Sequence, residues 1–103
     1  MVFTIRAIIE VIGHPEDHIN RVSSKVLENI KKEAGFVVLK ENLSKAEVVK
    51  ENIFASHLEV ELKIINLKRL FDFCYDYLPS DIQIIDAEKI VLPASEFNDG
   101  LSE

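Results

Sequence analysis

The segment FASHLEVELKII, residues 54–65, decides the fold because its side chains alternate in character along its whole length. One side of the alternation holds Phe54, Ser56, Leu58, Val60, Leu62 and Ile64. The other side holds Ala55, His57, Glu59, Glu61, Lys63 and Ile65. A period of two is typical of a β-strand with one face on a core and the other mostly toward water. The sequence therefore predicts a long strand here, around which the other elements arrange themselves.

Residues 3–12 alternate in the same way and predict a second strand, with apolar side chains on both faces. The turn Gly13-His14-Pro15-Glu16-Asp17 ends this strand and opens a helix, since Pro15 suits a first helical position and acids complement the helix dipole. Apolar residues then recur at helical spacing at Ile19, Val22, Val26, Leu27 and Ile30. With Lys31 and Lys32 in the last turn and Gly35 as the C-cap, the helix is expected over about residues 15–34.

The rest of the chain predicts two more strands and a second helix. Residues 36–43 and 82–87 have strand character, and the polar stretch 44–52 is interpreted as a hairpin extension or a mobile loop. Asn66 is a good N-cap, and Pro79 ends the helix that follows it. The helix carries an apolar stripe of Leu67, Leu70, Phe71, Cys74 and Leu78. Phe73 and Tyr77 fall off that stripe, so they are expected on a flank, outside the core.

The order β-α-β-β-α-β predicts an α+β, ferredoxin-like domain over residues 1–92. Right-handed crossovers place both helices on one face of a four-stranded antiparallel sheet, in the order 4-1-3-2 with strands numbered along the chain. A C-terminal tail, residues 93–103, follows the domain. The tail could form a short helix exposing Phe97 and Leu101, and we expect it to dock on the domain or on a neighbour.

Composition limits the partners and the compartment. The net charge of −6 weighs against nucleic acid as a main partner, because a phosphate backbone repels such a field. The single cysteine, Cys74, cannot form an internal disulfide, so nothing points to an oxidising compartment. No apolar run approaches the roughly 20 residues of a spanning helix, and the N-terminus lacks the layout of a signal peptide. We therefore expect a cytoplasmic protein without a membrane association.

The turn between the first strand and the first helix is the candidate ligand site. Backbone N–H groups at a helix start bind anions, and glycine lets a ligand approach the main chain closely. Two acids already supply negative charge there, so a zwitterion such as an amino acid fits better than a phosphate. The candidate ligand-binding residues are Gly13, His14, Glu16, Asp17 and His18.

Other chemistry-bearing residues have structural interpretations that we favour. His14 and His18 could share a metal, but a structural zinc site needs four ligands and His57 is the only other histidine. Cys74 is expected as a buried, inert thiol. The outer sheet face is expected to form cross-strand ion pairs, with an acid–base catalytic cluster as the alternative. Its charged residues are Arg6, Glu10, His57, Glu59, Glu61 and Lys63. No catalytic set, metal site or cofactor is predicted.

The run EVIGHPEDHI, residues 10–19, together with the order of elements, resembles the small ACT-like regulatory domains. Those domains carry a strand, a short turn with Gly or Pro, and then an amphipathic helix. The resemblance covers about residues 3–91 in pattern. It implies side-by-side pairing of domains and an amino-acid site near the turn.

The functional expectation is a small cytoplasmic module that assembles with itself or with a partner and is a candidate sensor of a small zwitterionic ligand. A homo-oligomer is expected because several apolar residues lack a place in the core. These residues are Ile8, Ile12, Ile65, Ile85, Phe73, Tyr77, Phe97 and Leu101. The alternatives are a small enzyme using the outer-sheet charges and an RNA- or ribosome-associated protein. The latter lacks exposed aromatic residues on the two central strands, where RNA bases would stack.

Overall fold

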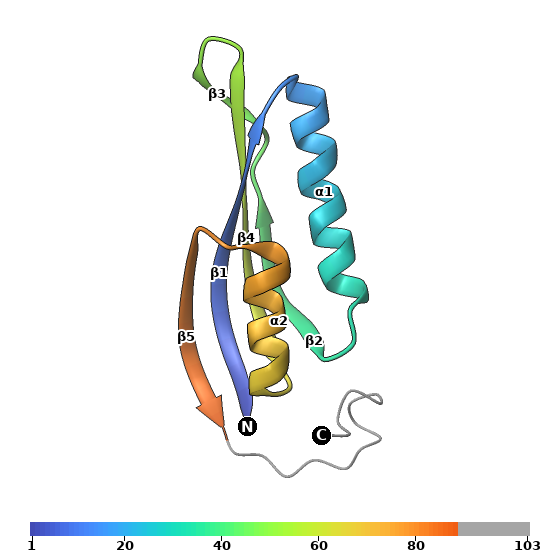
Figure 1. Ribbon diagram of the computed structural model, residues 1–103, viewed down its shortest axis with the longest axis vertical. Helices are drawn as coiled ribbons and strands as arrows, with labels where there is room; N and C mark the ends of the chain where they lie inside the picture. The colour runs from blue at the N-terminus through green and yellow to red at the C-terminus, as the bar shows by residue number, and fades with distance from the viewer. Residues whose placement is uncertain (89–103) are drawn as a thin grey trace.

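The computed structural model describes residues 1–88, which form two helices and five strands (Figure 1). In chain order the elements are β1 (Val2–Gly13), α1 (Glu16–Lys32), β2 (Phe36–Leu43), β3 (Glu47–Lys50), β4 (Ile53–Ile64), α2 (Leu67–Tyr77) and β5 (Asp81–Glu88). The protein is therefore an α+β domain with an antiparallel sheet, as the sequence predicts. The tail, residues 93–103, and the apolar residues 90–92 lie outside the described residues.

The sheet is built on its two longest strands, β1 and β4. They pair antiparallel along their whole length, from Phe3 opposite Ile64 to Gly13 opposite Phe54. Strand β2 flanks β4 and strand β5 flanks β1, which gives the order β2-β4-β1-β5. This is the order that the sequence predicts for its four strands.

The expected number of four strands is wrong, because β3 adds a fifth that pairs with β4. The stretch 44–52 is thus a hairpin extension and not a mobile loop. Ser44 lies between β2 and β3, which both pair with β4, and it forms two hydrogen bonds to His57 of β4. Its N–H donates to the carbonyl of His57 at 2.9 Å, and its Oγ accepts from the N–H of His57 at 3.0 Å. All four residues of β3 are exposed, so no apolar alternation marks it in the sequence.

Both helices cover the same face of the sheet, and the core lies between them and that face (Figure 1). The core combines β1 and β4 side chains of one parity with Ile30 from α1 and Leu70 and Phe73 from α2. The strand side chains are Phe3, Ile5, Ala7 and Ile9 from β1, Phe36 from β2, and Leu58, Val60, Leu62 and Ile64 from β4. The alternation that the sequence shows in residues 54–65 is therefore the division between core and outer face.

The end of α1 differs from the prediction. The helix stops at Lys32 with Glu33 as its C-cap, and the N–H of Glu33 donates to the carbonyl of Ile30 at 3.2 Å. Gly35 lies beyond the cap, with a φ of +89° that favours glycine. A Cβ there would meet a methyl group of Ile65 at 3.0 Å. Gly35 therefore serves the close approach of the α1–β2 turn to the start of α2.

The predicted core face of α2 is only partly right, because Leu70 is buried and Cys74 packs against the core, but the other members do not. Phe73, expected on a flank, is fully buried and packs edge-on against Phe36 with ring centroids 5.7 Å apart. Tyr77 packs against the core beside it, whereas Leu67, Phe71 and Leu78 are exposed. Two of the apolar residues expected on the outer face, Ile12 and Ile85, are exposed, Ile8 is half-buried and Ile65 is buried. The helix carries a core stripe and an exposed apolar stripe, and the sequence pattern combines members of both.

Candidate functional site

The predicted ligand residues lie together at the turn from β1 into α1, at one end of the molecule (Figure 1). His14, Glu16, Asp17 and His18 are all exposed. A Cβ on Gly13 would meet the Cδ1 atom of Ile19 at 3.1 Å, so the glycine makes room for packing of the first helical turn. The structure thus brings the five residues to one open turn. Among residues 1–88, no three His, Cys, Asp or Glu side chains gather in a way that could hold a metal ion.

The outer face of the sheet carries the expected cross-strand charges. Arg6 Nη2 lies 3.6 Å from Glu61 Oε2, and His57 Nε2 lies 2.7 Å from Glu10 Oε2. Both pairs sit directly opposite each other in the register of β1 and β4. The sequence predicts that Arg6 offsets Glu59 or Glu61, and the structure selects Glu61.

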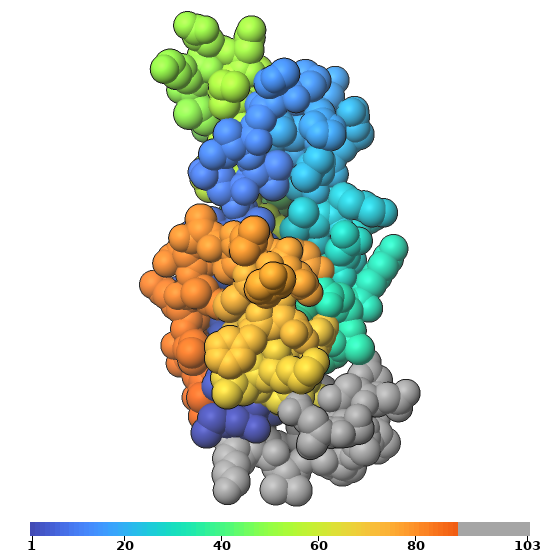
Figure 2. Space-filling model, viewed as in Figure 1, coloured from blue at the N-terminus to red at the C-terminus, as the bar shows by residue number. Residues whose placement is uncertain are grey.

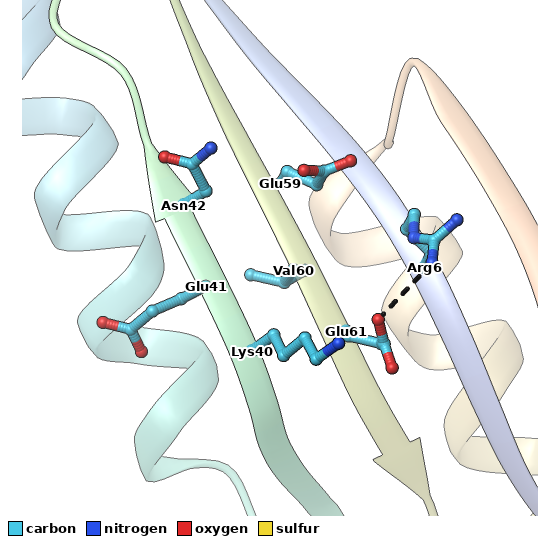
Figure 3. Close-up of a pocket in the computed structure, with 7 residues that line it drawn as sticks. All are labelled: Arg6, Lys40, Glu41, Asn42, Glu59, Val60 and Glu61. Carbon is cyan, nitrogen blue, oxygen red and sulfur yellow. Dashed lines mark ion pairs between the residues drawn. The ribbon is translucent and has the colours of Figure 1, made fainter.

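A surface cavity of about 350 Å³ opens on this outer face (Figure 3). Its walls come from β1, β2 and β4 and combine Arg6, Lys40, Glu41, Asn42, Glu59, Val60 and Glu61. Glu61 is opposite Arg6 on one neighbouring strand and opposite Lys40 on the other, so one carboxylate sits between two cations. The cavity therefore presents both signs of charge within one small depression.

Sequence reasoning missed the three β2 residues of this cavity, Lys40, Glu41 and Asn42. The pairing of β2 with β4 shifts register between Val38 and Lys40, and this irregularity brings Lys40 opposite Glu61. Strict alternation from Phe36, which faces the core, would put Lys40 on the core side. No signal in the sequence marks the position of such a bulge.

On the core side of the molecule, a polar network fixes the orientation of α2. Arg69 lies over the ring of Phe36 at 4.5 Å and donates to the carboxylates of Glu33 at 2.8 Å and Asp72 at 2.9 Å. The hydroxyl of Tyr77 donates to the same Glu33 carboxylate. This network ties one flank of α2 to the end of α1 and the start of β2.

The network also shifts the acidity of its members. Burial, reinforced by the bond to Glu33, raises the pKa of the Tyr77 phenol above its usual value. The hydrogen bond from Arg69 lowers the pKa of Asp72. Cys74, on the same helix, is half-buried, whereas the sequence predicts a buried thiol. This partial burial raises the pKa of the Cys74 thiol. A raised pKa lowers the thiolate fraction, which makes Cys74 a poor nucleophile.

The opposite flank of α2 faces β5 and is apolar and exposed. Phe71, Tyr75 and Leu78 are 64%, 83% and 75% exposed, and Leu67 begins the same stripe. On β5, Ile82 and Ile84 pair with Ala7 and Ile5 and so lie on the helix side of the sheet. We call the set of Leu67, Phe71, Tyr75, Leu78, Ile82 and Ile84 the α2–β5 surface. Figure 2 shows α2 and β5 adjoining on one face of the molecule.

The exposure of the α2–β5 surface follows from the position of α2. Arg69 holds the helix toward the α1–β2 turn, and the helix does not cover the edge strand β5, of which all eight residues are exposed. Ile84 therefore remains 58% exposed although it shares a face with fully buried Ile5. The sequence shows the apolar residues of this surface but assigns three of them to the core.

These features define a small α+β domain with an exposed apolar surface at one sheet edge and a charged cavity on the outer face. Within residues 1–88, no helix is long and apolar enough to cross a membrane. The chain belongs to the MJ0538 family, whose model matches residues 4–103. No curated protein and no solved structure matches it.

Proposed function

We propose that this protein is an association module that assembles with further copies or with a different protein through the α2–β5 surface. In this proposal the fold is a ferredoxin-like domain extended by β3, and the module works in the cytoplasm. The observation that carries the proposal is the apolar flank of α2, which lies beside an edge strand that neither α1 nor α2 covers.

The energetic argument rests on the exposed side chains of this flank. Phe71 and Tyr75 are each more than half exposed and lie one turn apart on α2, and the exposed Leu78 follows as the C-cap of the helix. Full burial of a Leu or Phe side chain is worth roughly 1.5–3 kcal/mol. Soluble proteins rarely expose large contiguous apolar patches, and those that do usually use them as interaction sites. A partner on the flank would therefore gain several such contributions at once.

The test compares two double variants by light scattering at tens of micromolar. The first, Phe71→Glu with Tyr75→Glu, places two charges on the α2–β5 surface. The matched control, Val48→Glu with Val49→Glu, places two charges at the exposed tip of β3, at the far end of the sheet. Assembly between copies through this surface predicts a wild-type mass above the monomer, a monomeric first variant and an unchanged control.

A hydrophobic-dye assay covers the case in which the partner is a different protein. The wild-type monomer should then bind the dye, and the first variant should lose most of this signal while the control keeps it. Thermal melts of all three proteins should agree, because the four substituted side chains are exposed. A monomer with no dye signal would overturn the proposal.

A second candidate function is the binding of a small zwitterion, and the outer-face cavity favours it. Arg6 and Lys40 could meet a carboxylate, and Glu59 could meet an ammonium group, within the same depression (Figure 3). The turn at Gly13 to His18 is the alternative location and stays a prediction. Titration of free amino acids against amide shifts in NMR separates the two. Shifts at residues 40–42 and 59–61 support the cavity, shifts at 13–19 support the turn, and no response at millimolar ligand overturns both.

Other functional classes have less support. The carboxylates of Glu10 and Glu61 on the outer face each have a cationic or histidine partner, which fits ion pairing better than acid–base catalysis. The net charge of −6 opposes a nucleic-acid partner.

A further inference from the structure

We infer that strand β5 receives an extended segment of a different protein, in which Lys or Arg residues alternate with apolar residues. This inference rests on the proposed function, since it names the partner of the α2–β5 surface. It follows from three properties of β5: its free edge, its two unlike faces and its charge.

The free edge of β5 is the first property. Strand β5 ends the sheet order and pairs with β1 along one edge only, within the described residues. All eight of its residues are exposed. An edge strand presents unpaired N–H and C=O groups to which a segment of another chain can add as a further strand. The main chain of β5 can thus supply the hydrogen bonds for such a partner.

The two faces of β5 differ in chemistry, and the register with β1 assigns its side chains except that of Ile85, which lies at the register shift. Ile82 and Ile84 lie on the helix side, next to the exposed flank of α2. The other side carries Asp81 opposite Ile8, Gln83 opposite Arg6, Asp86 opposite Thr4 and Glu88 opposite Val2. Side chains of an added strand alternate between the same two faces. One set would therefore meet an apolar surface, and the other set would meet three acids.

Arg6, the cation that the register places beside the acidic side of β5, does not neutralise it. Arg6 is opposite Gln83 in the register, but its guanidinium pairs with Glu61 on β4, on the side away from the β5 edge. Asp86 also accepts a bond from the N–H of Ala87 at 2.9 Å, which leaves its charge in place. The acids at the edge can therefore be matched by the cations of an incoming strand.

Charge argues against a second copy as the added strand. Antiparallel pairing of two β5 strands centred between Ile84 and Ile85 would place Asp81 opposite Glu88 at both ends and Asp86 opposite Gln83 between them. Like charges directly opposite each other destabilise a strand pair. The net charge of −6 on each copy adds to this repulsion. A basic segment from another protein would be attracted to the acids of β5, whereas a second copy of β5 would be repelled by them.

The experiment uses fluorescein-labelled octapeptides as probes and measures anisotropy with the full chain. The first probe alternates Lys and Val, the second alternates Glu and Val, and the third holds the Lys and Val residues of the first in two blocks. We expect saturable binding of the first probe, weakening as salt rises. We expect no binding of the second and at least tenfold weaker binding of the third.

Charge reversal on the protein supplies the matched pair of variants. Asp86→Lys with Glu88→Lys changes the edge, and Glu47→Lys with Glu51→Lys makes the same change in net charge at the exposed β3 end. The edge variant should bind the Lys–Val probe at least tenfold more weakly than the wild type does, and it should bind the Glu–Val probe, which the wild type does not. The β3 variant should bind the Lys–Val probe within a factor of two of the wild type.

Three results overturn the inference: no binding of the Lys–Val probe, equal binding of the blocked probe, or an equal loss in both variants. The proposed function fails separately, through the light-scattering and dye results of the Phe71→Glu/Tyr75→Glu variant. A protein that assembles through that flank but ignores the Lys–Val probe keeps the proposed function and loses this inference.

Discussion

The two helices cover the same face of the sheet, yet their outward sides have opposite chemistry. Every exposed residue of α1 is polar or charged: Glu16, Asp17, His18, Arg21, Ser24, Lys25, Glu28, Asn29, Lys31 and Lys32. The exposed residues of α2 are Leu67, Lys68, Phe71, Tyr75 and Asp76, of which three are apolar or aromatic. A helix that only closes a core needs the first pattern. The second pattern indicates a helix with a further surface to cover.

The difference also lies in how each helix is held. Helix α1 buries Ile19, Ser23 and Ile30, and its single apolar stripe determines its orientation. Helix α2 places Leu70 and Phe73 in the core, and Arg69 and Tyr77 on one flank bond to Glu33. The exposed apolar residues lie on the other flank of the helix.

Substitution of the two α2 phenylalanines gives the sharpest contrast between its faces. Phe73→Ala should lower the free energy of unfolding by about 3–5 kcal/mol, because it leaves a cavity in a fully buried site. Phe71→Ala should change it by less than about 0.5 kcal/mol, because the side chain is largely exposed. Urea unfolding of both variants measures the contrast. Similar losses in the two would contradict the assignment of the buried stripe.

The link between Tyr77 and Glu33 predicts a dependence of stability on alkaline pH. The pKa of Tyr77 is raised in the folded state, so its contribution is present below the ordinary phenol pKa of about 10 and is lost as pH rises beyond it. Tyr77→Phe should cost about 1–2 kcal/mol at neutral pH by removing a bond to a charged group. The variant should also lose part of the alkaline fall in melting temperature.

A spectroscopic control isolates this phenol. In a Tyr75→Phe background, Tyr77 is the only tyrosine, and its tyrosinate absorption should appear only above the ordinary pKa. Addition of Glu33→Gln should move that absorption to lower pH. An unmoved titration would mean that Glu33 does not hold the phenol.

Ser23 offers a way to strengthen α1. Its Oγ atom is buried on the core side of the helix, and among the described residues it has no hydrogen-bond partner. Ser23→Ala should raise the free energy of unfolding by about 1 kcal/mol, since it removes an unsatisfied hydroxyl and favours the helix. Thermal and urea unfolding against wild type would check this. A loss of stability would show that the hydroxyl has a partner in solution.

The smallest expected effect concerns the ion pair by which α1 contacts β2. Lys31 Nζ lies 2.7 Å from Glu41 Oε2, and both side chains are about half exposed. Lys31→Met should cost no more than about 0.5 kcal/mol, because solvent screens exposed pairs. High salt should reduce even that difference. If Lys31→Met lowered the free energy of unfolding as much as Tyr77→Phe does, polar contacts would hold α1 as strongly as they hold α2, which contradicts the contrast drawn above.

The sequence predicts the parts of the fold that follow from alternation and from chain order. The long alternating strands β1 and β4, the turn at Gly13, the N-cap at Asn66 and the strand order all agree with the structure. The sequence does not predict β3 as a separate strand, because its four residues are exposed on both faces. Periodicity reports burial, and an unburied strand therefore leaves no periodic signal.

The candidate sites are less accessible to prediction. The turn residues 13–18 are neighbours in sequence, so their proximity in space carries little information. The cavity on the outer face depends on the register shift before Lys40, and the α2–β5 surface depends on how α2 is rotated on the sheet. A contact between Glu33 and Arg69, which are distant in sequence, accompanies this orientation of the helix. Neither a bulge nor a long-range polar contact has a local signature.

The pairing of β1 with β4 has a consequence for synthesis on the ribosome. Strand β1 is made first, but its partners are β4, which begins at Ile53, and β5, which begins at Asp81. At roughly 5–20 residues per second, Phe3 waits about 3–12 s for the translation of Ile64, its partner in the register. Throughout that interval the nascent chain carries an apolar alternating strand with neither edge paired. The same strand that later forms the centre of the sheet is thus the segment of the growing chain most in need of protection from aggregation.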